Sequence, residues 1–197
     1  MRQETELQGV KSNLYDRNSV YGWISILLHW LTAIIIIALW FVGQSISWAA
    51  PEEIISRRAL HVSIAASAWA LLLFRVIWRF RSGHPRVRGQ TPGIHRIAKT
   101  THYVMLIVVL LMMVSGPTML WAGGNPVNVF GWFSVPGPIG KSPTTGDLAY
   151  FIHSNAALLL FWLVVLHIGG ALKHLMFHSD DTIARMIWPG RREGNDT

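Results

Sequence analysis

The stretch that decides the fold is residues 148–177, LAYFIHSNAALLLFWLVVLHIGGALKHLMF, in which His153 and His167 interrupt a long apolar run. A helix rises about 1.5 Å per residue, so about 20 mostly apolar residues cross the hydrocarbon core of a bilayer. The spacing of 14 residues between these histidines corresponds to about 1400° of rotation, about 40° short of four turns, and to about 21 Å of rise. Both imidazoles are therefore expected on one face of a membrane-spanning helix, at two depths.

Three other stretches meet the same test of length and polarity. The predicted spans are 23–42, 58–79, 98–121 and 148–177. The first run is longer than the apolar region of a signal peptide, so we expect it to be retained as a helix. With 51% hydrophobic and 14% charged residues, the 197-residue chain is expected to form one domain over residues 21–178. The predicted fold class is an all-α membrane protein with a four-transmembrane-helix bundle.

The positions of the charges predict the orientation. Lysine and arginine concentrate in 1–20, 79–99 and 173–192, whereas the connections on the other side carry only Arg57, Arg58 and Lys141. This positive-inside pattern puts both termini in the cytoplasm. The net charge of +7 then reflects orientation and attraction to anionic membrane lipid, and we expect no nucleic-acid partner. The bundle is expected to be flanked by a cytoplasmic tail (1–20), a periplasmic loop (122–146), and a cytoplasmic interfacial helix and tail (179–197).

Four histidines within the spans pair by depth. His29 and His167 are expected toward the cytoplasmic side, and His61 and His153 toward the periplasmic side. An imidazole in a bilayer is costly without a partner, which favours a shared ligand for each pair. Cysteine is absent, so thiolate-held clusters and covalently attached haem are excluded. The pattern predicts two b-type haems enclosed by the bundle, each with two axial histidines and no open position for oxygen.

Other interpretations of these residues stay open. His102 competes for the cytoplasmic site, His174 is in phase with His167, and the histidines could instead relay protons in a haem-free transporter or scaffold. His84, His95 and His178 are expected to be solvated, and the methionines of the third span to be packing residues. Cations at plausible depths for haem propionates are Arg57, Arg58, Arg75, Arg79 and Lys173, each of which could equally be an interfacial residue.

A set of short motifs extends over residues 20–188. They are Tyr21-Gly22, Leu28-His29-Trp30-Leu31, Leu60-His61, Arg75, Trp78-Arg79, His102-Tyr103, Ser115-Gly116, His153, His167, Ala171-Leu172-Lys173-His174, Asp180-Asp181-Thr182 and Arg185-Met186. With them the chain resembles the bacterial cytochrome b561 family of di-haem, four-helix inner-membrane proteins. The segment 130–133 (FGWF) resembles a longer-loop subgroup. The resemblance implies that the iron ligands are His29, His61, His153 and His167.

The resemblance also implies a function. Some members of that family are superoxide:ubiquinone oxidoreductases, which take electrons at the periplasmic face and reduce quinone. We therefore expect electron transfer between a periplasmic donor such as superoxide and the membrane quinone pool. An alternative is an electron-carrier or membrane-anchor subunit whose periplasmic redox protein partner docks on 122–146.

Overall fold

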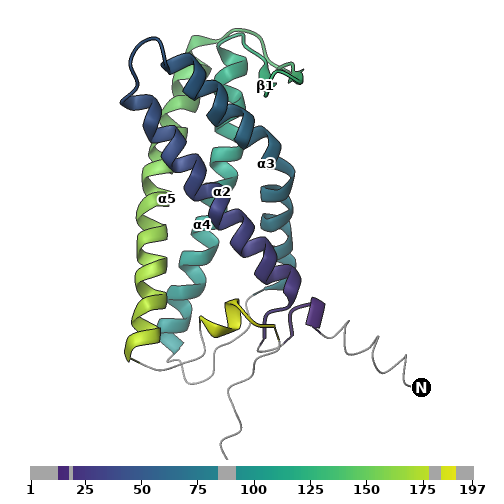
Figure 1. The fold of residues 1–197 in the computed structure, drawn as a ribbon, viewed down its shortest axis with the longest axis vertical. Helices are drawn as coiled ribbons and strands as arrows, with labels where there is room; N and C mark the ends of the chain where they lie inside the picture. The colour runs from purple at the N-terminus through teal and green to yellow at the C-terminus, as the bar shows by residue number, and fades with distance from the viewer. Residues whose placement is uncertain (1–12, 18–19, 84–91, 178–182, 190–197) are drawn as a thin grey trace, which may run out of the picture.

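The computed structural model describes residues 13–17, 20–83, 92–177 and 183–189, and its main feature is a bundle of four long helices (Figure 1). The helices are α2 (Trp23–Ser47), α3 (Ile54–Ser82), α4 (Pro92–Ala122) and α5 (Pro143–Phe177). Each is long and apolar enough to cross a membrane, which confirms the predicted four-helix membrane fold. The helices contain the predicted spans and extend beyond most of their ends.

The helix ends follow local rules. Pro51–Glu53 form a turn before α3, where the Ser56 hydroxyl donates to the Glu53 carbonyl oxygen at 2.8 Å. The helix α3 ends at Gly83, whose φ of 67° is a backbone conformation that glycine adopts without strain. Gly22 precedes α2, and a Cβ there would lie 2.4 Å from the Leu14 carbonyl oxygen. Only glycine therefore allows the chain before α2 to pack so closely.

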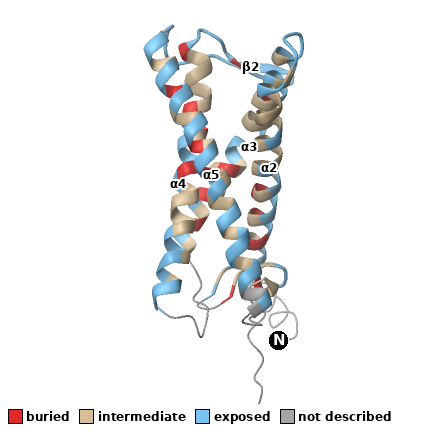
Figure 2. Ribbon diagram, turned by 90° about the vertical axis from the view of Figure 1, so that its left-hand side faces the viewer, coloured by how far each residue is buried: buried red, intermediate tan, exposed pale blue. Residues whose placement is uncertain are grey.

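The helices pack as two pairs, α2 with α3 and α4 with α5, which meet at mid-height. One apolar cluster, around Ala68, Leu72 and Met113, joins α3 to α4. A second, around Val108, Ala156 and Leu160 of α4 and α5, is contacted by Ile36 of α2. The rings of Trp40 and Phe161 stack with centroids 4.7 Å apart and join α2 to α5. Buried residues lie on the inward sides of the helices, and the outward sides are apolar and exposed (Figure 2). The outward surface thus suits lipid contact.

The connection between α4 and α5 contains an element that the sequence did not predict. Strands β1 (Val127–Val129) and β2 (Phe133–Val135) form an antiparallel hairpin with Val129 opposite Phe133. The turn contains Phe130 and Gly131 with positive φ values of 50° and 74°. Val127 and Val129 are buried against the bundle. We call this end of the bundle the hairpin end and the opposite one, where the chain enters α2, the terminal end.

The terminal end carries the C-terminal segment as well. A cytoplasmic interfacial helix and tail are predicted over 179–197, and the described part of that range, 183–189, contains a 3-10 turn, η1 (Ala184–Met186). Asp180–Thr182 lie outside the described residues. The Trp30 indole N–H donates to the Met186 carbonyl oxygen at 2.7 Å, which ties this turn to α2.

Candidate functional site

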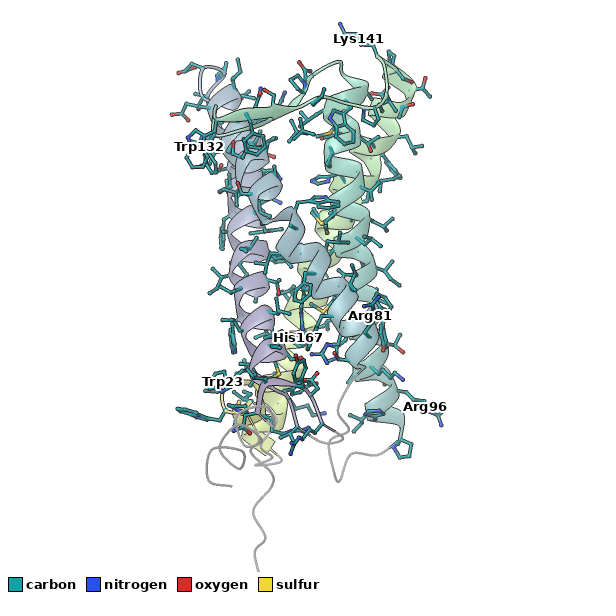
Figure 3. All side chains as sticks on the ribbon, turned by 90° about the vertical axis from the view of Figure 1, so that its right-hand side faces the viewer. Trp23, Arg81, Arg96, Trp132, Lys141 and His167 are labelled. Carbon is teal, nitrogen blue, oxygen red and sulfur yellow. The ribbon has the colours of Figure 1, made fainter. Side chains whose placement is uncertain are left out.

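The structure brings the four predicted histidines together in two pairs. The ring centroids of His61 and His153 lie 6.3 Å apart near the hairpin end, and we call these residues the hairpin-side pair. The centroids of His29 and His167 lie 6.1 Å apart nearer the terminal end, and these form the terminal-side pair. Figure 3 shows His167 within the bundle, toward the terminal end. The pairs are those expected from depth, and their role as iron ligands stays a prediction.

The separation within each pair fits one metal ion between two imidazoles. Two imidazoles bound on opposite sides of a metal through bonds of about 2 Å have ring centroids about 6 Å apart. The observed centroid distances are 6.1 and 6.3 Å, and the rings of the two pairs are inclined by 61° and 85°. The residues present therefore fit a haem that the two imidazoles of a pair would hold between them.

The hairpin-side pair has close support from α2 and α4. A Cβ at Gly116 would lie 3.3 Å from His153 Cε1, and a Cβ at Gly43 would lie 3.3 Å from His61 Cε1. The Ser115 hydroxyl is 3.1 Å from His153 Nδ1. If Nε2 binds a metal, Nδ1 carries the proton and donates to this oxygen, which fixes the tautomer and the ring orientation. Glycine thus leaves space for each imidazole, and serine orients one of them.

A 14-residue register runs through all four helices. It joins His29 to Gly43 on α2, His61 to Arg75 on α3, His102 to Gly116 on α4, and His153 to His167 on α5. Four turns separate the members of each pair, so each helix contributes one residue to each of two layers. The hairpin-side layer consists of Gly43, His61, Gly116 and His153, and the terminal-side layer of His29, Arg75, His102 and His167. The sequence prediction used this spacing only on the last helix.

His102 belongs to the terminal-side layer without being a member of its predicted ligand pair. Its ring centroid is 5.1 Å from that of His167, closer than the 6.1 Å between His29 and His167. The shorter separation leaves less room for a metal between the rings, which favours the His29 and His167 pairing. His84 and His178 lie outside the residues that the structure describes, and so does the side chain of His174. His95 lies near the start of α4, away from both layers.

Below the terminal-side layer lies a polar cluster that the sequence did not predict, the terminal cluster (Asp16, Gly22, Ser25, Trp78 and Arg79). The Asp16 carboxylate accepts from the Gly22 N–H at 2.9 Å, the Ser25 hydroxyl at 2.8 Å and Arg79 Nη1 at 3.1 Å. Ser25 in turn accepts from the Trp78 indole N–H at 2.8 Å. The side chains of Arg79 and Asp16 are only 3% and 6% exposed, so the ion pair is buried.

Tyr21 lies beside this cluster, between two guanidinium groups. The Arg79 and Arg185 guanidinium carbons lie 5.2 and 5.8 Å from the centre of its ring. Burial raises the pKa of the Tyr21 phenol, and the positive charges of Arg79 and Arg185 offset this effect only in part. The phenol therefore stays protonated at neutral pH.

The predicted propionate cations are placed differently. Arg57 donates to the Ser45 carbonyl oxygen at 2.9 Å and pairs with Glu53 at 2.6 Å near the hairpin end. Arg58 and Lys173 are exposed, and Arg79 is engaged by Asp16. Arg75 differs from these, because its Nη1 atom is inaccessible to solvent and has no hydrogen-bond partner among the described residues. Among the predicted propionate cations, Arg75 is therefore the one with a buried nitrogen that has no partner in the described part of the chain.

Comparisons with known proteins agree with this architecture. The family model described as prokaryotic cytochrome b561 matches residues 20–189. The chain is 34% identical to cytochrome b561 homolog 2 of Escherichia coli K12 over 177 residues, which cover 85% of this chain and 90% of that protein. It is 23% identical to cytochrome b561 homolog 1 of the same organism, with 89% and 97% coverage. It is also 22% identical to a probable superoxide oxidase, CybB, of Yersinia pestis, with 85% and 95% coverage.

Proposed function

The chain belongs to the prokaryotic cytochrome b561 family of membrane electron-transfer proteins with b-type haem, and from that premise we propose that each histidine pair holds one haem. The hairpin-side haem is held by His61 and His153, and the terminal-side haem by His29 and His167. The observation that carries this proposal is the separation of about 6 Å between ring centroids in both pairs, which suits two imidazoles on one iron.

Each haem, when bound, would supply one-electron oxidation and reduction. The residues of the chain fix where that chemistry takes place. Helix α5 contributes a ligand to both layers, with about 21 Å of rise between them, and the apolar clusters at mid-height exclude water between the layers. Ser115 holds the His153 ring, and Arg75 places a buried positive charge in the terminal-side layer. The arrangement suits electron transfer along the membrane normal.

The substrates of this proposal are a small donor at the hairpin end and a membrane quinone. With both termini cytoplasmic, as the lysine and arginine distribution predicts, the hairpin end is periplasmic and the bundle lies in the bacterial inner membrane. The relative from Yersinia pestis is described as a probable superoxide oxidase, which supports superoxide as the donor. Two superoxide ions would each lose one electron and become dioxygen, while one quinone would gain two electrons and two protons.

A second candidate is supported by the surface of the hairpin. Phe130, Trp132 and Phe133 are 47%, 81% and 57% exposed, and Trp132 projects from the hairpin end (Figure 3). Exposed aromatic side chains are typical of protein interfaces. In this case the protein would be an electron carrier or membrane anchor for a periplasmic redox protein that docks on residues 122–146.

Histidine variants test the haem assignment. We expect His153→Ala and His61→Ala each to remove the hairpin-side haem, and His167→Ala and His29→Ala each to remove the terminal-side haem, as followed by reduced-minus-oxidised spectra. His95→Ala is the matched control, and it should keep both haems because His95 lies outside both layers. Loss of the same haem from His29→Ala and His61→Ala would contradict the pairing.

A rapid-mixing experiment separates the two candidate functions. A pulse of superoxide onto purified protein with bound quinone should reduce the haems within the mixing time if superoxide is the donor. Absence of fast reduction, in protein that carries both haems, would instead favour the carrier for a periplasmic redox protein.

A further inference from the structure

The two layers differ in the residues that are not predicted ligands. In the hairpin-side layer these are Gly43 and Gly116, each next to a histidine of its pair. In the terminal-side layer they are Arg75 on α3 and His102 on α4. The helices thus repeat one geometry at two depths but add a permanent positive charge at only one of them.

The charge of Arg75 is not paired with the Asp16 carboxylate of the terminal cluster. Asp16 already accepts three hydrogen bonds, one of them from Arg79 in a buried ion pair. Tyr21, whose ring lies beside the Arg79 guanidinium, is protonated at neutral pH, because burial raises the pKa of its phenol. Arg75 Nη1 is inaccessible to solvent and has no hydrogen-bond partner within the described part of the chain. Within the described residues, Arg75 therefore keeps its positive charge without a paired carboxylate.

The hairpin-side layer has no corresponding cation. None of its four members is charged, and Arg57, one turn before His61, forms an ion pair with Glu53. The side chains of Arg57 and Glu53 are 36% and 50% exposed, so water screens the electrostatic effect of this ion pair on the hairpin-side layer. A charge in the interior acts much more strongly than a charge at the surface, because the surrounding dielectric constant is lower.

From this difference, and resting on the proposed binding of one haem in each layer, we infer that Arg75 sets the direction of electron transfer. A nearby positive charge stabilises the reduced form of an iron centre relative to the oxidised form, since reduction adds one negative charge. Arg75 thereby raises the midpoint potential of the terminal-side haem above that of the hairpin-side haem. One electron leaves the hairpin-side haem and is taken up by the terminal-side haem, with no bond formed or broken. Arg75 acts through its positive charge on the midpoint potential and does not bind the iron.

The test is a potentiometric titration of single-haem variants. His61→Ala leaves the terminal-side haem and His29→Ala leaves the hairpin-side haem, so each midpoint potential can be measured without overlap. The terminal-side haem should have the higher midpoint, and adding Arg75→Gln should lower it. We expect the electron-transfer equilibrium between the haems to change at least tenfold, about 59 mV for one electron. Arg75→Lys should preserve most of the potential, because it keeps the charge.

Controls separate this inference from the haem assignment on which it rests. Arg81→Gln removes an exposed cation from the same helix and should change neither midpoint appreciably. If Arg75→Gln fails to bind haem, the order of the two midpoints in the His61→Ala and His29→Ala proteins still decides the question. A terminal-side midpoint equal to or below the hairpin-side one, or one unchanged by Arg75→Gln, would overturn the inference. Loss of the same haem from both histidine variants would instead overturn the haem assignment.

Discussion

The hairpin-side and terminal-side layers are built on one helical register but have different surroundings. In the hairpin-side layer, glycines leave space beside both imidazoles, Ser115 orients one of them, and a β-hairpin covers the end of the bundle. In the terminal-side layer, the two residues that are not predicted ligands are Arg75 and His102, and a buried ion pair lies beyond them toward the terminal end. The comparison suggests that four helices of one spacing can hold two similar cofactors while side chains of different charge make them unequal.

The largest effect is expected from closing the space in the hairpin-side layer. Gly116→Val adds a branched side chain where even a Cβ would lie 3.3 Å from His153 Cε1, so we expect loss of the hairpin-side haem and retention of the terminal-side haem. The measurement is the haem content with reduced-minus-oxidised spectra. Gly169→Val is the control, because a Cβ at Gly169 meets nothing within 4 Å. Loss of both haems, or of the terminal-side haem alone, would contradict a specific role of Gly116 in the hairpin-side layer.

The next largest effect concerns the support of the terminal-side layer. Asp16→Asn removes the charge that pairs with buried Arg79 and should lower the free energy of unfolding by about 3–5 kcal/mol, since an unpaired buried charge remains. Thermal unfolding in detergent followed by circular dichroism measures this change. Glu53→Gln breaks an ion pair with partly exposed partners and should cost at most about 1 kcal/mol. Equal effects from the two substitutions would show that burial of the Asp16–Arg79 pair does not matter.

A smaller effect should follow from removing the hydrogen bond to the hairpin-side pair. Ser115→Ala leaves His153 Nδ1 without its hydroxyl partner at 3.1 Å and should weaken haem binding in that layer about 10–100-fold. Titration of haem into the apoprotein measures the affinity of each layer separately. Ser154→Ala is a suitable control, because the Ser154 hydroxyl donates to the Tyr150 carbonyl oxygen in its own helix. Equal affinity in Ser115→Ala and wild-type protein would mean that Ser115 does not orient the ligand.

The smallest effect is expected at the attachment of the hairpin. The Phe130 N–H donates to the Ser63 hydroxyl oxygen at 2.9 Å, and Ser63 lies two residues after His61. Ser63→Ala should loosen the hairpin by about 1 kcal/mol, the typical net value of one hydrogen bond. Hydrogen exchange of the backbone amides of residues 127–135 should then become faster while exchange in α5 stays unchanged. Faster exchange in both regions would indicate general destabilisation.

The sequence predicted those features that depend on local periodicity. Hydropathy marks each span without reference to any other part of the chain, and the spacing of His153 and His167 follows from helix geometry alone. The structure confirms the four-helix fold and brings the predicted pairs together. Extending the same 14-residue spacing to the other helices would have found Gly43, Arg75 and Gly116 as well.

Features that depend on contacts between distant segments could not be predicted in this way. Each strand of the hairpin has three residues, and its place depends on Ser63, more than 60 positions earlier in the chain. Asp16 lies in a polar tail with no periodic pattern, and its contact with Arg79 follows from how that tail folds back. The sequence also did not distinguish Arg75 from the other candidate cations, because that distinction rests on burial and hydrogen bonding.

The central claim is that each layer holds one haem between two histidines. The most direct test is the ratio of haem to polypeptide in fully loaded, purified protein, determined with the pyridine haemochrome assay and quantitative amino-acid analysis. The account predicts two b-type haems per chain in the wild-type protein and one in either the His153→Ala or the His167→Ala variant. A colourless protein, or one haem per chain at saturation in the wild type, would contradict it.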